Sequence, residues 1–278
     1  MMAPAPLAAS IEVSPKQAIE SPDLPGLFPP ATRVYVTDLG SDGDETLVRA
    51  VRRLADLGYV AVPHLAARRA GARAAVEARI GALAERGGAR EMLVIGGGPD
   101  RPAGDFATAL DILETGFLDR FGYTDVAVAG HPETSSGFPA DAAMRALRAK
   151  ADFAARTDAR MRIVTQFGFD GPAFVAWAEG LAAEGVDLPV HLGVAGPAKL
   201  TTLLKYAMAC GVGNSLGFLR KRALSFGALA TQQSPEDVVA PVERHVQTHP
   251  DGPIRQIHVF AFGGLTGAAD WLRERGSW

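Results

Sequence analysis

The chain has almost none of the residues that hold disulfide-rich domains or cysteine-ligated metal clusters together. Cys210 is the only cysteine among 278 residues, which excludes an intramolecular disulfide and a cysteine-based metal cluster. We expect Cys210 to be a small, buried apolar side chain. No apolar run is long enough to span a bilayer. Residues 1–10 lack the basic start and apolar core of a signal peptide, so we expect a cytoplasmic protein.

A strong excess of charge of either sign is also lacking. Lysine and arginine number 28 against 31 aspartates and glutamates, a net charge of −3. No strong field therefore attracts the chain to nucleic acid or to an anionic membrane. The hydrophobic content of 47% is enough for one large core. We expect one domain over residues 1–278.

Short apolar segments alternate with segments of helical periodicity along the whole chain. Strands are predicted at residues 10–15, 33–37, 59–64, 91–95, 125–129, 162–166, 188–193 and 254–262. Helices are predicted at residues 45–57, 66–86, 106–117, 141–156, 170–183, 199–209, 216–230 and, as the last, 236–248. Strict alternation favours a parallel sheet, and eight strands in a chain of this length are typical of a (β/α)8 TIM-type barrel. An open, doubly wound sheet is the alternative. A dinucleotide-binding fold is not expected, because no strand is followed by Gly-x-Gly-x-x-Gly and a helix.

Two segments have local signals of their own. Proline occurs at positions 22, 25, 29 and 30, so a proline-rich segment replaces much of the first helix. Residues 162–170 are predicted to be an apolar strand that ends in Thr165 and Gln166, then a helix with Asp170 as N-cap and Pro172 in its first turn.

Polar residues and glycines follow the predicted strands, where a barrel places its reaction site. They are Glu12, Thr37, Asp38, His64, Gly96, Gly97, Gly98, His131, Glu133, Gln166, His191, Gly263 and Gly264. This set contains no lysine, so it suits a polar, planar, mostly neutral ligand better than a phosphorylated sugar.

Two mechanisms fit this set of residues. In the first, Glu12 is a general acid, and the glycines let a flat ring approach the backbone. In the second, His64, His131, His191 and Glu133 bind a divalent metal that activates water in a hydrolase. The second ranks lower because the histidines lack the close spacing of strong metal motifs.

Several segments together resemble the methylenetetrahydrofolate reductase family. They are residues 10–15 (Ser-Ile-Glu-Val-Ser-Pro), 36–37 (Val-Thr), 63–65 (Pro-His-Leu), 131–133 (His-Pro-Glu), 165–170 (Thr-Gln-Phe-Gly-Phe-Asp) and 257–260 (Ile-His-Val-Phe). They occur in the family's order over almost the whole chain, and the Thr-Gln-Phe-x-Phe-Asp run is the most specific.

The resemblance implies a β/α barrel that reduces 5,10-methylenetetrahydrofolate to 5-methyltetrahydrofolate, in most members with NAD(P)H through a bound FAD. Glu12 then resembles the general acid that protonates N10 of the folate, and Gln166 the residue that hydrogen-bonds the pterin. Phe174 and Tyr206 fall where the family has aromatic contacts to folate or nicotinamide. For both, packing within the helix core is the alternative. The family's carboxylate after the fourth strand is either Asp100, displaced by two residues and then a substrate-binding residue, or it is missing from this chain.

The resemblance also places cofactor contacts, and here the chain departs from the family. The predicted flavin-binding residues are Thr37, His64, Gly97, Gly98, His131 and Lys150. His131 stands where the family has a tyrosine, and Gly264 where it has an arginine. These departures motivate the hypothesis that flavin binding is weak or absent and that NAD(P)H delivers hydride directly to the folate.

Three questions stay open at the level of sequence. The enzyme could run as 5-methyltetrahydrofolate oxidation in a demethylation pathway, because one site serves both directions. A folate-binding protein without catalysis is a further alternative. The third open question is the oligomeric state, for which a homo-oligomer is one option; the expected partners are tetrahydrofolate derivatives, and no nucleic acid or membrane.

Overall fold

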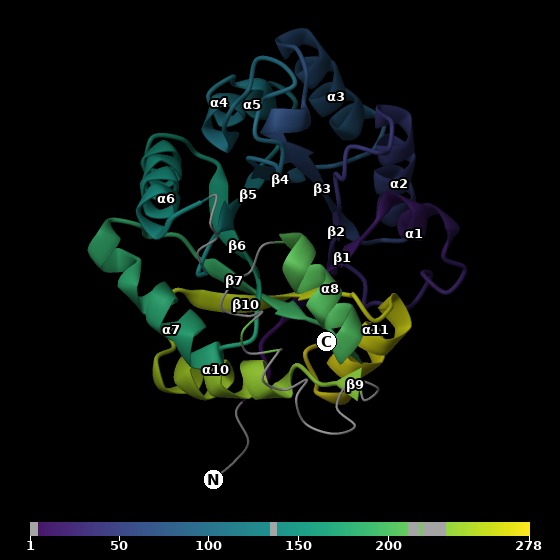
Figure 1. Cartoon of the computed structure of the whole chain (residues 1–278). Helices are drawn as coiled ribbons and strands as arrows, with labels where there is room; N and C mark the ends of the chain where they lie inside the picture. Colours follow the sequence, from purple (N-terminus) through teal and green to yellow (C-terminus); the bar gives the residue numbers. More distant parts are fainter. Residues whose placement is uncertain (1–4, 134–137, 211–216, 218, 220–231) are drawn as a thin grey trace. The chain divides into compact units, whose positions relative to one another are not determined.

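The computed structural model describes residues 5–133, 138–210, 217, 219 and 232–278. Eight parallel strands form a closed barrel in the order β1-β10-β7-β6-β5-β4-β3-β2, and the helices alternate with them along the chain (Figure 1). The predicted (β/α)8 TIM-type barrel is therefore confirmed.

The barrel strands are β1 Ala9–Val13, β2 Arg33–Val36, β3 Val60–Ala66, β4 Glu91–Ile95, β5 Asp125–Gly130, β6 Arg160–Gly168, β7 Val190–Ala195 and β10 Ile254–Phe260. A separate antiparallel pair comprises β8 Ala198–Lys199 and β9 Gln232–Gln233. The described helices are α1 Pro15–Glu20, α2 Asp44–Asp56, α3 Arg73–Glu85, α4 Ala109–Leu113, α5 Phe117–Arg120, α6 Ala140–Ala155, α7 Gly171–Gly180, α8 Leu200–Cys210, α10 Glu236–Thr248 and α11 Leu265–Glu274, with 3-10 turns at Ala67–Arg69 and Ala182–Glu184. Among the described helices, none has the length and apolar character needed to cross a membrane.

The chain divides into two compact units. The N-terminal unit comprises Ser10–Ala129 and Asp152–Ile163, and the C-terminal unit comprises Met1–Ala9, Gly130–Ala151 and Val164–Trp278.

In the N-terminal unit, the proline-rich segment leaves room for only a short first helix, as predicted. Helix α1 has six residues and begins with a capping box between Ser14 and Gln17. Arg53 of α2 donates hydrogen bonds to the carbonyls of Ala18, Ile19 and Ser21. A cation from a neighbouring helix therefore satisfies carbonyl groups at the end of α1 that no intrahelical N–H can reach.

A buried network of charges connects β2, β4, β5 and β6 within the same unit. Arg162 Nη2 donates to Glu91 Oε2 at 2.6 Å, and Arg162 Nε donates to the Tyr35 hydroxyl at 2.9 Å. Arg33 Nε lies 2.8 Å from the same Glu91 oxygen, and Asp125 Oδ1 lies 3.9 Å from Arg162 Nη1. Burial raises the pKa of Tyr35, so its hydroxyl stays protonated. Because the charges compensate one another, this polar interior is compatible with a stable fold.

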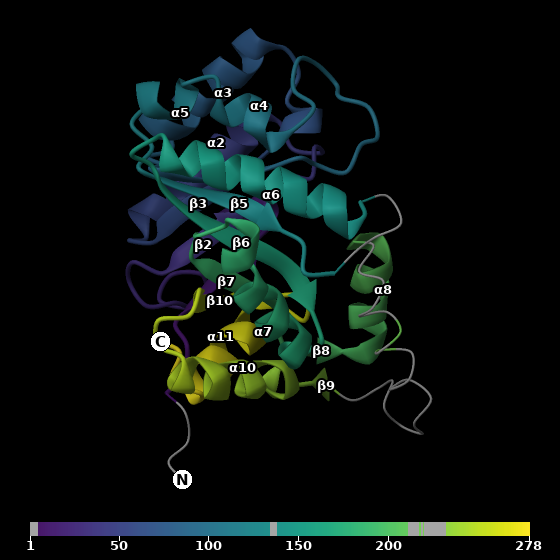
Figure 2. The same ribbon diagram turned by 90° about the vertical axis from the view of Figure 1, so that its left-hand side faces the viewer.

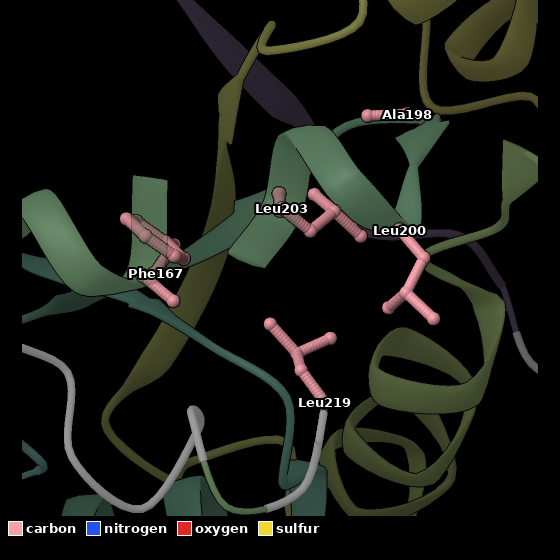
Figure 3. Packing of buried hydrophobic residues seen from close by; sticks show 7 residues of the cluster. Phe167, Ala198, Leu200, Leu203 and Leu219 are labelled. Atoms are coloured by element: carbon pink, nitrogen blue, oxygen red, sulfur yellow. The ribbon is translucent and has the colours of Figure 1, made fainter. Parts of the chain in front are cut away.

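In the C-terminal unit, α8 is anchored by an apolar cluster of Phe167, Ala195, Ala198, Leu200, Leu203, Ala207 and Leu219. Figure 3 shows Leu200 and Leu203 projecting from α8, with Leu219 and Phe167 in the same cluster. Helices α7 and α10 lie side by side in both views (Figures 1 and 2). Asp170 caps α7 by accepting from the Ala173 N–H at 3.0 Å, as the sequence predicts.

The structure corrects two predicted helices in the N-terminal unit. Residues 66–86 are not one helix, because β3 runs through Ala66 and the chain turns at Gly71, with φ of +75°, before α3 begins. Residues 106–117 are two short helices separated by Gly116, with φ of +73°. In both places a glycine with positive φ interrupts the helix, although apolar residues continue at helical spacing beyond it.

Two further differences, and one prediction that stays untested, concern the C-terminal half. Strand β6 continues through Gly168, so Thr165 and Gln166 lie inside the strand and not at its end. Helix α11 follows β10, although 236–248 was predicted to be the last helix. The helix predicted at 216–230 lies outside the described residues, apart from positions 217 and 219.

Replacing Arg162 with methionine should lower the free energy of unfolding by about 3–5 kcal/mol, because Glu91 and Asp125 lose a buried cation that compensates them. Urea denaturation followed by circular dichroism measures this change. Arg160→Met is the matched control, since Arg160 also pairs with Asp125 but from a side chain that is 73% exposed. Equal urea midpoints for the two variants would contradict the structural role of the network.

Candidate functional site

The predicted site residues fall in both units. Glu12, Thr37, His64, Gly97, Gly98 and Asp100 belong to the N-terminal unit, and His131, Lys150, Gln166, Phe174 and Tyr206 belong to the C-terminal unit.

Within the N-terminal unit, the structure brings Glu12 and His64 together. Glu12 Oε2 of β1 lies 3.6 Å from His64 Nε2 of β3, and the side chains are 15% and 9% exposed. The edge of the Tyr35 ring packs against the His64 imidazole, with the ring centroids 6.0 Å apart. The separation of 3.6 Å is too long for a hydrogen bond between these two atoms. It does place an imidazole within ion-pair distance of a largely buried carboxyl group, which is a candidate general acid.

Thr37 and Asp38, the two residues that directly follow β2, have different surroundings. The Thr37 Oγ1 atom is buried and has no hydrogen-bond partner among the described residues. Asp38, by contrast, accepts from the backbone N–H of Ala66 at 3.3 Å and lies 3.3 Å from the Arg79 guanidinium. Asp38 therefore fixes the loop after β2, while Thr37 retains hydrogen-bonding capacity for a ligand.

The glycine segment after β4 is held closely by the 3-10 turn that follows β3. Gly97 has φ of +89°, and a Cβ there would lie 3.3 Å from the Ala66 side chain. A Cβ at Gly98 would lie 3.7 Å from the Arg69 guanidinium. Arg68 donates to the carbonyl of Pro99 at 3.3 Å. Local backbone conformation and packing therefore require glycine at position 97, whereas the contact at Gly98 is an ordinary van der Waals distance.

Asp100 is exposed in the loop that follows these glycines. Among the described residues, its carboxylate has no contact with Glu12 or His64, so the structure does not bring these three predicted residues together. Its role in substrate binding remains a prediction.

In the C-terminal unit, a hydrogen-bonded group surrounds Gln166. Gln166 Nε2 donates to the carbonyl of Glu133 at 3.0 Å, and Gln166 Oε1 lies 3.3 Å from His131 Nδ1. The Phe138 ring packs edge-on against His131, with the ring centroids 4.9 Å apart. The structure therefore brings two of the predicted residues, Gln166 and His131, into direct contact. That the Glu133 carbonyl accepts this hydrogen bond could not be predicted from the sequence, because the carbonyl is a backbone group.

The backbone around Gln166 is fixed by Thr165. The Thr165 hydroxyl accepts from the Gly193 N–H at 2.8 Å and donates to the Gln166 carbonyl at 2.8 Å. A Cβ at Gly193 would lie 2.5 Å from the Thr165 carbonyl oxygen and 2.6 Å from that of Gln166. Glycine in β7 therefore permits the close approach that sets the position of Gln166.

Burial changes the protonation of two basic residues in this unit. Burial lowers the pKa of His131, opposed by its hydrogen bond to Gln166 and assisted by the charge of Lys150. His131 is consequently neutral at pH 7. Burial also lowers the pKa of Lys150, to about 8, so Lys150 keeps most of its charge at neutral pH but is easily deprotonated.

The two predicted aromatic contacts have different surroundings. Phe174 of α7 is 1% exposed, and its ring fills the space where a Cβ of Gly168 would lie. This position favours helix core packing, the alternative to ligand contact. Tyr206 of α8 is 38% exposed and stacks on Phe262, with centroids 4.0 Å apart and planes 12° apart. Phe262 was not predicted as a site residue, although its place directly after β10 could have indicated it.

Two other expectations concern cysteine and metal binding. Cys210 is exposed at the end of α8, so the prediction that it is buried is wrong; the apolar face of α8 is supplied by Leu200, Leu203 and Ala207. In the described ranges, no three His, Cys, Asp or Glu side chains are grouped so that they could hold a metal ion. The geometry therefore gives the metal-dependent alternative no support.

The stability of Lys150→Met relative to the unchanged protein should fall by about 2–3 kcal/mol between pH 7 and pH 10.5. Between pH 8 and 10.5 the unfolded chain binds more protons at Lys150 than the folded chain does, so the free energy of unfolding of the unchanged protein rises with pH in a way that the variant lacks. Thermal unfolding across this pH range measures the difference, with the exposed Lys205→Met as control. A difference in stability that does not change with pH would exclude the charge as its cause.

Comparisons with known proteins show the fold. A scan against models of protein families gives no match. Among solved structures, the chain is similar to an uncharacterized protein from Clostridium thermocellum that binds two copies of 5-methyl-5,6,7,8-tetrahydrofolic acid, with a TM-score of 0.60 and 9% identity over 96% of this chain and 95% of that chain. It is also similar to the Bacillus cereus spore cortex-lytic enzyme SleL, with a TM-score of 0.47 and 11% identity over 98% of this chain and 75% of that chain. At these identities, the first likeness shows a common barrel fold, and the second is too remote to support an argument.

Proposed function

We propose that this protein is an oxidoreductase that interconverts 5,10-methylenetetrahydrofolate and 5-methyltetrahydrofolate with NAD(P)H. The observation that carries the proposal is the contact of 3.6 Å between Glu12 and His64 within the N-terminal unit. The sequence resemblance assigns the general acid to Glu12, and the fold is similar to that of a protein that binds 5-methyltetrahydrofolate.

Glu12 supplies the proton in the proposed reaction. Its carboxyl group protonates N10 of the methylene compound, the five-membered ring opens, and the resulting iminium at N5 accepts a hydride. NAD(P)H supplies that hydride and leaves as the oxidised nucleotide. His64 stands beside the carboxyl group and can return a proton to it after each turnover. General acid catalysis of this kind contributes about 10²- to 10⁴-fold to a rate.

Binding of the folate is assigned to the C-terminal unit. Gln166 is partly exposed and keeps hydrogen-bonding capacity beyond its two contacts with His131 and Glu133, which suits a pterin with several polar ring atoms. Tyr206 offers an exposed aromatic face, supported from behind by Phe262, on which a flat ring can stack.

The predicted flavin contacts do not fit a resident FAD. Its diphosphate needs cations, yet His131 is neutral at pH 7 because burial lowers its pKa. Arg68 and Arg69, beside the glycine segment, keep their charge, but their guanidinium groups are held by hydrogen bonds to the carbonyls of Pro99 and Asp38. Lys150 alone of the predicted contacts in the C-terminal unit can provide positive charge. We therefore propose direct hydride transfer between NAD(P)H and the folate, in either direction, including oxidation of 5-methyltetrahydrofolate in a demethylation pathway.

A folate-binding protein without catalysis is the second candidate. It is favoured by the structural neighbour from Clostridium thermocellum, which is described by what it binds and not by a reaction. The two candidates differ in NAD(P)H oxidation, which only the first would show.

Glu12→Gln should lower the turnover of methylenetetrahydrofolate about 10²- to 10⁴-fold, because the amide cannot donate the proton. Binding of NAD(P)H and of 5-methyltetrahydrofolate should stay unchanged. Absorbance at the nicotinamide band measures turnover, and Glu20→Gln, at an exposed residue of α1, is the control. Near-normal turnover of Glu12→Gln would reject the role of Glu12.

The freshly purified protein should be colourless, and its NAD(P)H oxidation should not increase when FAD is added. A visible spectrum and paired assays with and without FAD test this expectation. A yellow protein with about one flavin per chain, or activity that depends on added FAD, would contradict direct transfer.

A further inference from the structure

The hydrogen bonds around Gln166 determine more than its position. A carboxamide has two N–H donors and an oxygen with two lone pairs, and exchanging its two ends leaves its shape almost unchanged. Whether a ligand finds a donor or an acceptor at Gln166 therefore depends on which end of the carboxamide faces which neighbour. Within the C-terminal unit, the neighbours are the Glu133 carbonyl at 3.0 Å and the His131 Nδ1 at 3.3 Å.

The Glu133 carbonyl decides the orientation of the amide. A carbonyl oxygen only accepts hydrogen bonds, so the nitrogen end of Gln166 must face it. The oxygen end then faces His131. Because that oxygen also only accepts, Nδ1 of His131 must carry the hydrogen. A neutral imidazole has one N–H, so Nε2 of His131 is left with a lone pair.

We propose that His131 is a positioning residue that acts as its Nδ1–H tautomer and holds Gln166 in a single orientation for ligand binding. After these two contacts, Gln166 retains one N–H and one oxygen lone pair. The remaining pair complements a flat heterocycle that presents both an acceptor and a donor, as a pterin does. The inference deepens the proposed function and rests on it for the identity of the ligand, but the tautomer can be tested without any ligand.

The surroundings of His131 support this assignment over the flavin contact that the sequence suggests. The Phe138 ring and the imidazole form a T-shaped pair with the centroids 4.9 Å apart, which restricts rotation of the imidazole. The hydrogen bonds of Thr165 to Gly193 and to the Gln166 carbonyl fix the strand from which the amide projects. Both partners of the contact are thus held from behind, as a preorganised binding residue requires.

The first test is the tautomer itself in the full-length protein. Long-range proton–nitrogen correlation spectra of protein labelled with ¹⁵N distinguish Nδ1–H from Nε2–H imidazoles. The chain has six histidines, and the signal that is lost in His131→Asn identifies the one of interest. At pH 7.5 we expect the Nδ1–H form. An Nε2–H imidazole at position 131 would overturn the inference.

The second test uses nearly isosteric variants and the binding of 5-methyltetrahydrofolate by calorimetry. His131→Asn keeps a donor near the place of Nδ1, and its Kd should stay within about threefold of the unchanged protein. His131→Asp presents only acceptors to the Gln166 oxygen, and His131→Leu presents neither a donor nor an acceptor. Both should weaken binding about tenfold or more. Melting temperatures of all three variants control for folding.

The outcomes separate this inference from the proposed function. If the unchanged protein binds 5-methyltetrahydrofolate and the three variants bind it equally well, His131 does not position Gln166, while the proposed function stands. If the unchanged protein does not bind the folate, the proposed function fails, and the tautomer still decides whether His131 orients Gln166. Weak binding by the Asp and Leu variants with retained binding by Asn supports the inference.

Discussion

The interaction on which the N-terminal unit depends is the buried contact of Arg162 with Glu91 and Tyr35. A guanidinium group that is shielded from water is tolerated only where anions and hydrogen-bond acceptors compensate it. Here Glu91 accepts from both Arg162 and Arg33, and the Tyr35 hydroxyl accepts from Arg162 Nε. The same Tyr35 ring packs against His64, which contacts Glu12. A network required for stability therefore also fixes the imidazole beside the proposed general acid.

In the C-terminal unit, polar groups shielded from water also need partners, and there the partners are neutral hydrogen-bonding groups. Gln166 makes hydrogen bonds with His131 and with the Glu133 carbonyl, and the backbone on either side of it is fixed by Thr165. A partly buried amide of this kind is costly when its hydrogen bonds are incomplete. The Glu133 carbonyl therefore restricts the orientation of the Gln166 amide, and that amide restricts the orientation of His131. In our proposal, the outcome is an amide with a defined donor and a defined acceptor for a ligand, as selective recognition of a heterocycle requires.

Much of the fold could be predicted from the sequence, because alternation of apolar strands and amphipathic helices is a local signal. All eight barrel strands were located in this way. Two of the errors occur where a single backbone conformation overrides periodicity, at Gly71 and Gly116. The extension of β6 through Gly168 was missed for a related reason: the glycine is needed because the Phe174 ring fills the space of its side chain, and no sequence pattern reports such a contact.

The site was predictable in its residues and not in its contacts. Glu12 and His64 are 52 positions apart, and only the register of β1, β2 and β3 places them at 3.6 Å. In the sequence, Phe174 and Tyr206 are both aromatic residues in predicted helices. In the structure, Phe174 is buried, whereas Tyr206 is partly exposed and stacks on Phe262. Burial and partner identity are tertiary properties, which explains why sequence alone left both with two interpretations.

The most direct test of the central claim uses NAD(P)H with deuterium at both C4 positions and follows that deuterium into the methyl group of 5-methyltetrahydrofolate by mass spectrometry. Direct transfer predicts one deuterium per methyl group at every stage of the reaction, with no loss to solvent, in a preparation free of flavin. Product that forms without label, or no product from a well-folded protein, would contradict the account.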